Sequence, residues 1–240
     1  MLNRRQVLGT LATSLFLTAC GKGYHRQLLQ ELYGERRINE VSAIQGIINS
    51  YEILVTNTKY RLTKEGEIKK AQRCGIGIAV NDYIISLNHI VSMDSIVFNT
   101  PFGLVAQEIF KEKEETTLDD IVLKEVIKDR EQDIAVFKLY DEYIGDKFPF
   151  ALGDSDKIQY GQEVLLIGNP QLQGINVREG IVSSKVRGNG FYVSANITHG
   201  DSGSALIDRH TFELLGLNTQ RHYDNVALIR PINLFKKYLK

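Results

Sequence analysis

The sequence predicts an all-β protein with a helical segment at each end, and three patterns support this fold class. From Tyr51 onward, short apolar runs alternate with clusters of turn residues, a spacing typical of strands in a barrel or sandwich. Between Tyr24 and Ser50 the apolar residues instead recur every three or four positions, which predicts helix. The same helical spacing returns after Pro231, where Phe235 and Leu239 share a face, and it predicts a short helix over residues 231–240.

The composition is that of an ordinary globular chain, long enough to bury a sizeable core. Of its 240 residues, 43% are hydrophobic and 24% are charged. Lysine plus arginine and aspartate plus glutamate both number 29, so the net charge is zero. Proteins that bind nucleic acid usually carry a basic excess, and we therefore expect no nucleic-acid partner. The two cysteines, Cys20 and Cys74, exclude a dense disulfide framework, and we expect Cys74 to be buried as a small apolar side chain.

Residues 1–19 have the organisation of an export signal. A positive stretch, Asn3-Arg4-Arg5, precedes an apolar run from Val7 to Leu17, which is shorter than the roughly 20 residues that span a bilayer. The following Leu17-Thr18-Ala19-Cys20 resembles a bacterial lipobox, which implies cleavage before Cys20 and a lipid on its thiol. An uncleaved membrane anchor is the alternative. The paired arginines leave open whether export uses the general or the twin-arginine route.

We therefore expect residues 20–50 to form a lipidated N-terminus and a helical spacer, held at the membrane through Cys20. The predicted location is the cell envelope, outside the cytoplasm. Gly21 and Lys22 replace the aspartate associated with retention in the inner membrane. This favours the outer membrane weakly and leaves the choice open.

The first β-rich part, residues 51–145, contains two candidate catalytic residues. A turn at Asn81-Asp82 joins two apolar strands, the second of which is predicted over residues 83–91 and carries His89 near its end. Functional side chains tend to lie where elements end. Residues 107–131 are highly charged and predict a solvated hairpin or loop. Asp133 then leads into the apolar run of residues 134–139, where a carboxylate needs a partner such as histidine.

The second β-rich part, residues 146–230, contains a serine in a glycine-rich turn, Gly200-Asp201-Ser202-Gly203-Ser204. Glycine permits backbone conformations in which successive amide N–H groups face one concavity, the geometry of an oxyanion hole. Taken alone, this segment is more typical of a loop between strands. A serine hydroxyl needs a base, and the base needs an orienting group. His89, Asp133 and Ser202 supply these in the order found in chymotrypsin.

At this point the chain resembles the trypsin-like serine proteases, and among them the HtrA/Deg-like bacterial branch. The likeness covers roughly residues 50–235 and rests on several motifs in the correct order. These are Gly75-Ile76-Gly77-Ile78-Ala79-Val80, Leu87-Asn88-His89-Ile90-Val91, Asp133-Ile134-Ala135-Val136, Leu152-Gly153-Asp154-Ser155-Asp156, Ile167-Gly168-Asn169-Pro170, Gly180-Ile181-Val182-Ser183 and Gly200-Asp201-Ser202-Gly203.

The resemblance implies two perpendicular six-stranded β-barrels over residues 51–240, with a catalytic triad in the cleft between them. His89 would be the general base, Asp133 its orienting carboxylate and Ser202 the nucleophile. The amides of Gly200 and Ser202 would form the oxyanion hole, with Asp201 shaping the loop between them. The expected reaction is hydrolysis of a protein or peptide substrate through an acyl-enzyme, with no metal or cofactor.

The specificity pocket is predicted from position relative to the serine. Asn196 and Ile197 should lie near its base, and Leu217, Asn218 and Thr219 along its wall. No acidic residue lies at the predicted base, which argues against cleavage after arginine or lysine.

Two further function classes stay open. A trypsin-like fold can be catalytically silent and act as a peptide-binding or sensor module, although silent members usually lose a triad residue. A serine esterase or acyltransferase on the same fold is the third reading. No PDZ domain is expected after the last motif, which favours a simple anchored protease over a cage-forming one. The oligomeric state is open.

Overall fold

The structure is a computed structural model that describes residues 40–61, 68–92, 95–100, 103–108, 110–169, 174–197, 200–223 and 225–240. The chain divides into two compact units, Met1–Gln45 and Gly46–Lys240. Of the first unit only residues 40–45 are described, and they belong to a helix over residues 40–49. The predicted export signal, Cys20 and most of the predicted spacer lie outside the described residues. No helix in the described part of the chain has the length and apolar character needed to span a membrane.

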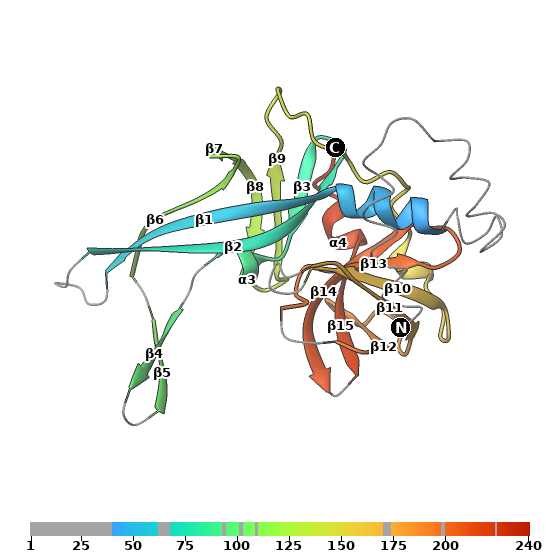
Figure 1. Ribbon diagram of the computed structural model, residues 1–240. Coiled ribbons are helices and arrows are strands. Elements are labelled where there is room, and N and C mark those ends of the chain that lie inside the picture. The colour runs from blue at the N-terminus through green and yellow to red at the C-terminus, as the bar shows by residue number, and fades with distance from the viewer. Residues whose placement is uncertain are drawn as a thin grey trace, which may run out of the picture. The chain divides into compact units, whose positions relative to one another are not determined.

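The unit Gly46–Lys240 consists of two lobes (Figure 1). Lobe 1 contains β1 (Tyr51–Arg61), β2 (Ile68–Val80), β3 (Tyr83–Ser86), α3 (Asn88–Val91), β4 (Ser95–Thr100), β5 (Gly103–Glu108), β6 (Phe110–Leu118), β7 (Ile121–Val122), β8 (Lys124–Asp129) and β9 (Ile134–Lys138). Lobe 2 contains η1 (Ser155–Lys157), β10 (Glu163–Gly168), β11 (Asn176–Val182), β12 (Phe191–Ala195), β13 (Ala205–Asp208), β14 (Leu214–Tyr223) and β15 (Val226–Pro231), followed by α4 (Asn233–Lys236).

Lobe 2 is a closed antiparallel barrel with the strand order β10-β11-β12-β15-β14-β13. Its interior is apolar because every second residue along each strand points inward. On β11, for example, Gly180 and Val182 are buried while Val177 and Ile181 are exposed. Phe191 is fully buried in the resulting core.

Lobe 1 is a sheet with the order β7-β6-β1-β2-β3-β9-β8 across the described residues, beside a separate β4–β5 hairpin. The long strands β1 and β2 pair along their whole length, from Tyr51 opposite Ile78 to Arg61 opposite Ile68. Figure 1 shows them extending side by side away from the barrel. The tight β2–β3 turn places Asn81 at φ 52°, a conformation that asparagine tolerates well.

The predicted all-β, trypsin-like fold is therefore confirmed, as one closed six-stranded barrel and one half-barrel. Two local predictions were wrong. The strand predicted over residues 83–91 ends at Ser86, and His89 lies on the short helix α3. The charged region expected to be a solvated hairpin or loop does contain the β6–β7 hairpin and is mostly exposed where it is described, although the Glu114 side chain is only 11% exposed beside Lys128. Cys74 is exposed rather than buried.

Candidate active site

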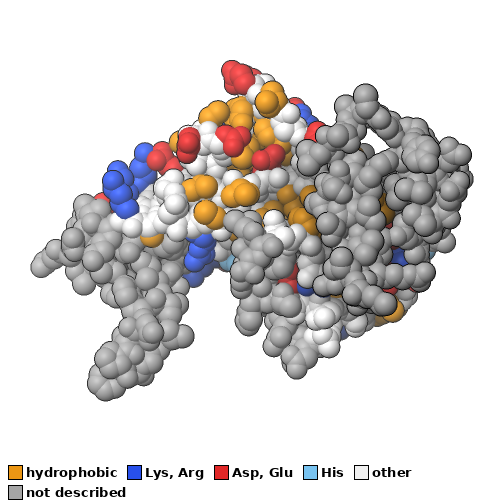
Figure 2. All heavy atoms as spheres, in the orientation of Figure 1, with side chains coloured by type: hydrophobic (Ala, Val, Ile, Leu, Met, Phe, Trp, Pro, Cys, Tyr) orange, Lys and Arg blue, Asp and Glu red, His pale blue; other side chains and the backbone are white. Residues whose placement is uncertain are grey.

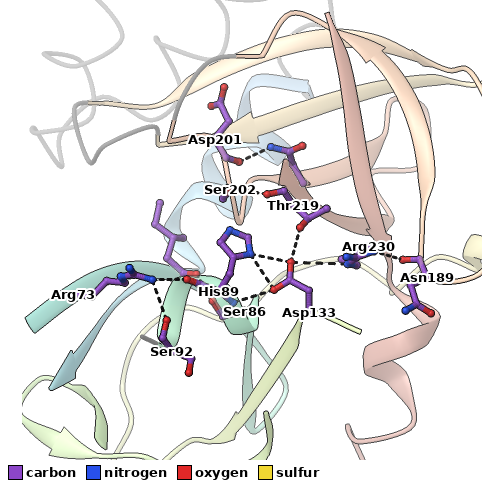
Figure 3. Close-up of polar contacts among 12 residues, drawn as sticks. Arg73, Ser86, His89, Ser92, Asp133, Asn189, Asp201, Ser202, Thr219 and Arg230 are labelled. Atoms are coloured by element: carbon purple, nitrogen blue, oxygen red, sulfur yellow. Dashed lines mark hydrogen bonds and ion pairs between the residues drawn. The ribbon is translucent and has the colours of Figure 1, made fainter. Parts of the chain in front are cut away.

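His89 and Asp133 form a closely matched pair in lobe 1 (Figure 3). The Nδ1 atom of His89 lies 2.8 Å from Oδ2 and 3.0 Å from Oδ1 of Asp133. The backbone N–H of His89 also donates to Oδ1, at 2.9 Å. The carboxylate thus fixes both the ring and the main chain of the histidine. Its position against Nδ1 leaves Nε2 as the nitrogen that can accept a proton.

Asp133 owes its position to a turn that ends directly before β9. Its φ of 52° is unusual for a residue with a side chain and turns the carboxylate toward α3. Thr219 donates its hydroxyl to Oδ2 at 2.5 Å, and Nε of Arg230 lies 4.0 Å from the same oxygen. Burial alone would raise the pKa of Asp133, but hydrogen bonds and charge from His89, and the Thr219 hydroxyl, outweigh it and lower this pKa. The carboxyl therefore stays ionised around neutral pH.

Ser202 reaches the same group of residues from lobe 2. Its hydroxyl donates to the backbone carbonyl of Thr219 at 2.9 Å, and no hydrogen bond links it to His89 in the described structure. Thr219 therefore contacts two predicted triad residues, Ser202 through its carbonyl and Asp133 through its hydroxyl. A hydroxyl held in this way must turn toward the imidazole before it can lose its proton to it.

The backbone around Ser202 leaves amide groups free for an oxyanion. Gly200 and Gly203 have φ values of 89° and 87°, which favour glycine. The N–H of Gly203 donates to the carbonyl of Asn218 at 2.8 Å. Among the described residues, the N–H groups of Gly200 and Ser202 have no acceptor. These are the two amides expected to form an oxyanion hole.

A buried ion pair supports this loop from behind. Asp201 has a side chain only 1% exposed, and the Arg178 guanidinium on β11 binds both its oxygens at 2.5 Å. Such a bidentate pair fixes position as well as charge. The same guanidinium donates to the backbone carbonyl of Asn196, and the Asn218 amide donates to the Asp201 carbonyl at 2.8 Å. The residue next to the nucleophile is therefore anchored on both its side chain and its main chain.

Two residues of lobe 1 that were not among the predicted site residues bind backbone groups near His89 and Ser202. Arg73 on β2 donates to the carbonyls of His89 and Ser92 at 2.7 and 3.0 Å, at the C-terminal end of α3. The buried hydroxyl of Tyr51 donates to the Ile167 carbonyl and accepts the N–H of Ala205, three residues after the nucleophile. Figure 3 shows the Arg73 contacts on the side of α3 away from the barrel.

The residues predicted for the specificity pocket differ in their burial and in their hydrogen bonds. Ile197 and Leu217 are buried, Ile197 within the barrel core. Asn218 and Thr219 are buried and hydrogen-bonded to the serine loop and to Asp133. Asn196 is exposed and contributes its carbonyl to Arg178. Their role in substrate selection stays a prediction, whereas their structural contacts were not foreseen.

Several known proteins are similar to this chain. A model of the trypsin-like peptidase domain matches residues 75–217. A probable periplasmic serine endoprotease, DegP-like, of Rhizobium meliloti is 32% identical over 164 residues, covering 65% of this chain and 29% of the relative. The periplasmic serine endoprotease DegP of Salmonella typhimurium is 29% identical over 168 residues, covering 64% and 31%. The chain thus matches about a third of the length of these relatives.

Solved structures give the same fold. The HtrA-type protease AlgW with a tripeptide superposes with a TM-score of 0.56 at 23% identity, covering 83% of this chain and 62% of that one. The same protease with a decapeptide gives 0.56 at 22% identity, covering 81% and 64%. At this identity the likeness concerns the arrangement of strands.

Proposed function

The chain belongs to the family of trypsin-like peptidase domains, and from that premise we propose that it is a serine endopeptidase that cleaves peptide bonds through an acyl-enzyme. One observation carries the proposal. A continuous hydrogen-bonded chain runs from His89 through Asp133 to Thr219 and on to Ser202, joining a base, its orienting carboxylate and a nucleophile from two lobes. A purely structural role requires no such chain.

The proposed reaction starts with rotation of the Ser202 hydroxyl from the Thr219 carbonyl toward Nε2 of His89. The oxygen attacks the substrate carbonyl carbon while His89 takes its proton, and Asp133 stabilises the resulting imidazolium. The N–H groups of Gly200 and Ser202 bind the oxyanion of the tetrahedral intermediate. His89 then gives its proton to the departing amine. Water, activated by the same base, hydrolyses the ester on Ser202 and restores the enzyme.

A labelled fluorophosphonate, which reacts with activated serines, tests this proposal. We expect the purified full chain to be labelled, and Ser202→Ala and His89→Ala to lose labelling. Ser183→Ala, at an exposed serine of lobe 2, is the matched control and should label like the wild type. A folded wild-type protein that stays unlabelled would favour the silent binding module instead.

A second assay separates the peptidase from the esterase that the same site would allow. The wild type should hydrolyse unfolded casein as well as an activated ester. Ester hydrolysis without any peptide cleavage would contradict the peptidase assignment. The peptides bound in the similar HtrA-type structures support the choice of a peptide substrate.

We also propose that the protein is held in the cell envelope by a lipid on Cys20. The lipobox-like Leu17-Thr18-Ala19-Cys20 and the periplasmic location in the names of the similar proteases support this. Metabolic labelling with a fatty-acid analogue should mark the wild type and not Cys20→Ala. Label that persists in Cys20→Ala would contradict the lipid anchor.

A further inference from the structure

Three lysines on neighbouring strands of lobe 1 occupy directly opposed positions. Lys59 on β1 faces Lys70 on β2 and Lys113 on β6 in the register of the sheet. Directly opposed residues project from the same face, and adjacent strands lie about 4.8 Å apart. Three ammonium groups therefore share one row, an arrangement of like charges that by itself destabilises a sheet. We call Lys59, Lys70 and Lys113 the lysine row.

The neighbouring row supplies polar groups and only one carboxylate. Asn57 is opposite both Gln72 and Glu115, and the Gln72 amide donates to Asn57 at 3.2 Å. Glu115 pairs with Lys113 at 2.7 Å. Among the described residues, neither Lys59 nor Lys70 has a carboxylate within ion-pair distance. Among the described residues of these two rows, three positive charges face one negative charge, an excess of two.

The two rows, together with Thr58 and Ala71 between them, line an open hollow of about 490 Å³ in the surface. Figure 2 shows Lys and Arg side chains gathered over the described end of β1 and β2. The opposite face of the same strands is used differently. There Thr58 and Ser92 donate to Glu114, beneath the end of α3. The lysine row thus lies on a separate face from the candidate active site.

Protection of the sheet edges against pairing with other chains explains only two of the three lysines in the row. Lysines on edge strands discourage pairing with other chains, and Lys113 and Lys70 lie where β6 and β2 have no further neighbour in the described sheet. Lys59 lies between them on a strand that is paired on both sides. A charge at that position protects no edge, and it increases the repulsion in the row.

We propose that the lysine row is a binding site for a phosphate group carried on a small polar headgroup. Lysine binds phosphate as a point charge, and the two excess positive charges match a phosphate monoester or a pair of diesters. The amides of Asn57 and Gln72 would hydrogen-bond the hydroxyl groups of the carrier. The open hollow beside the row lets a phosphate carrier lie against both rows. The site does not depend on the proposed peptidase activity.

Calorimetry with glycerol phosphate tests the site on the full chain. The protein carries Ser202→Ala to prevent self-digestion and Cys20→Ser so that no lipid anchors it. We expect Lys59→Gln/Lys70→Gln to weaken binding about tenfold or more, as for loss of two charge-assisted contacts. The control Lys185→Gln/Lys236→Gln removes the same charge from other surface positions and should leave binding unchanged.

Folding of the variants is checked by thermal denaturation. Because the substitutions relieve repulsion, their melting temperatures should equal or exceed that of the parent. Lys70→Glu is a second variant that places an opposite charge beside Lys59. It should fold with a new ion pair and also lose glycerol phosphate binding.

Vesicles distinguish the two sources of phosphate. Sedimentation with phosphatidylglycerol vesicles, lost in the double variant and absent for phosphatidylcholine alone, would assign the site to lipid headgroups. Binding of glycerol phosphate without vesicle binding would assign it to a dissolved phosphate compound. No binding in either arm, equal loss in the lysine control, or tighter binding of a polyglutamate peptide than of glycerol phosphate would overturn the proposal.

Discussion

Replacing Arg178 by methionine should disorder the loop around Ser202 at temperatures where the rest of the protein is still folded. Methionine keeps most of the side-chain volume but removes the charge that neutralises Asp201. Because the Arg178 and Asp201 side chains are 10% and 1% exposed, solvent cannot take the place of the guanidinium. Removing one partner of such a buried pair typically costs about 3 to 5 kcal/mol, because a buried charge is left without a partner.

For a chain of this size, that loss corresponds to a fall in melting temperature of roughly 6 to 20 °C. The activity should fall further than the stability suggests. Asp201 lies between the two amides assigned to the oxyanion hole, and loss of one oxyanion donor typically lowers kcat by about 100- to 1,000-fold. We therefore expect kcat to fall by about two orders of magnitude at a temperature where the variant is still folded, with little change in KM.

Two matched variants control for charge and for the unpaired carboxylate. Glu179→Gln changes the neighbouring residue on β11, whose carboxylate is 70% exposed and pairs with Arg209, and should cost less than about 1 kcal/mol. Arg178→Met/Asp201→Asn removes both charges and should recover part of the lost stability. The assays are thermal denaturation, the kinetics of ester hydrolysis and the rate of fluorophosphonate labelling. If Arg178→Met melts and labels like the wild type, the ion pair does not hold the serine loop.

Three other predictions test the supporting contacts. Tyr51→Phe removes the buried hydroxyl that joins β1 to the barrel and should lower the free energy of unfolding by about 1 kcal/mol in urea titrations; an unchanged midpoint would contradict this. Arg73→Gln frees two carbonyls of the helix that carries His89 and should slow fluorophosphonate labelling several-fold, with Arg73→Lys restoring part of the rate; equal rates in all three proteins would exclude a positioning role. Hydrogen bonding, chiefly from Asn233, lowers the pKa of Asp154 from 3.8 to about 2, so its contribution to stability is complete above pH 4 and is lost as the pH falls toward 2. In Asp154→Asn, the free energy of unfolding should therefore fall less steeply than in the wild type as the pH drops from about 4 to about 2. Equal slopes in the two proteins would contradict the lowered pKa of Asp154.

The sequence predicts the three candidate catalytic residues, but it does not predict the contacts that fix their positions. His89, Asp133 and Ser202 could be predicted as a triad because each lies where an apolar run begins or ends, in an order shared by one fold. The ion pair of Asp201 could not be foreseen. Arg178 lies on a strand whose neighbouring residues are exposed, and only closure of the barrel brings it to the serine loop.

The burial of Glu114 and the exposure of Cys74 have a related cause. Most charged residues around Glu114 are exposed, as charge usually is, but the Glu114 side chain is only 11% exposed. In the structure, Lys128 and the hydroxyls of Thr58 and Ser92 surround this one carboxylate and make its burial tolerable. Cys74 was placed inside on the basis of its residue type, but its position in the strand directs it outward. Pairing partners from distant strands decide both cases, and they depend on register rather than on local pattern.

The division of the proposed triad between the lobes also determines when in folding the site can form. His89 and Asp133 belong to the half of the chain that is synthesised first, whereas the strands that hold Ser202, β13 and β14, come near the end. Contacts between such distant segments form late in folding. A nascent or half-folded chain therefore carries the proposed base, His89, without the proposed nucleophile, Ser202. Closure of the lobe 2 barrel therefore brings the serine to the histidine only when folding is nearly complete.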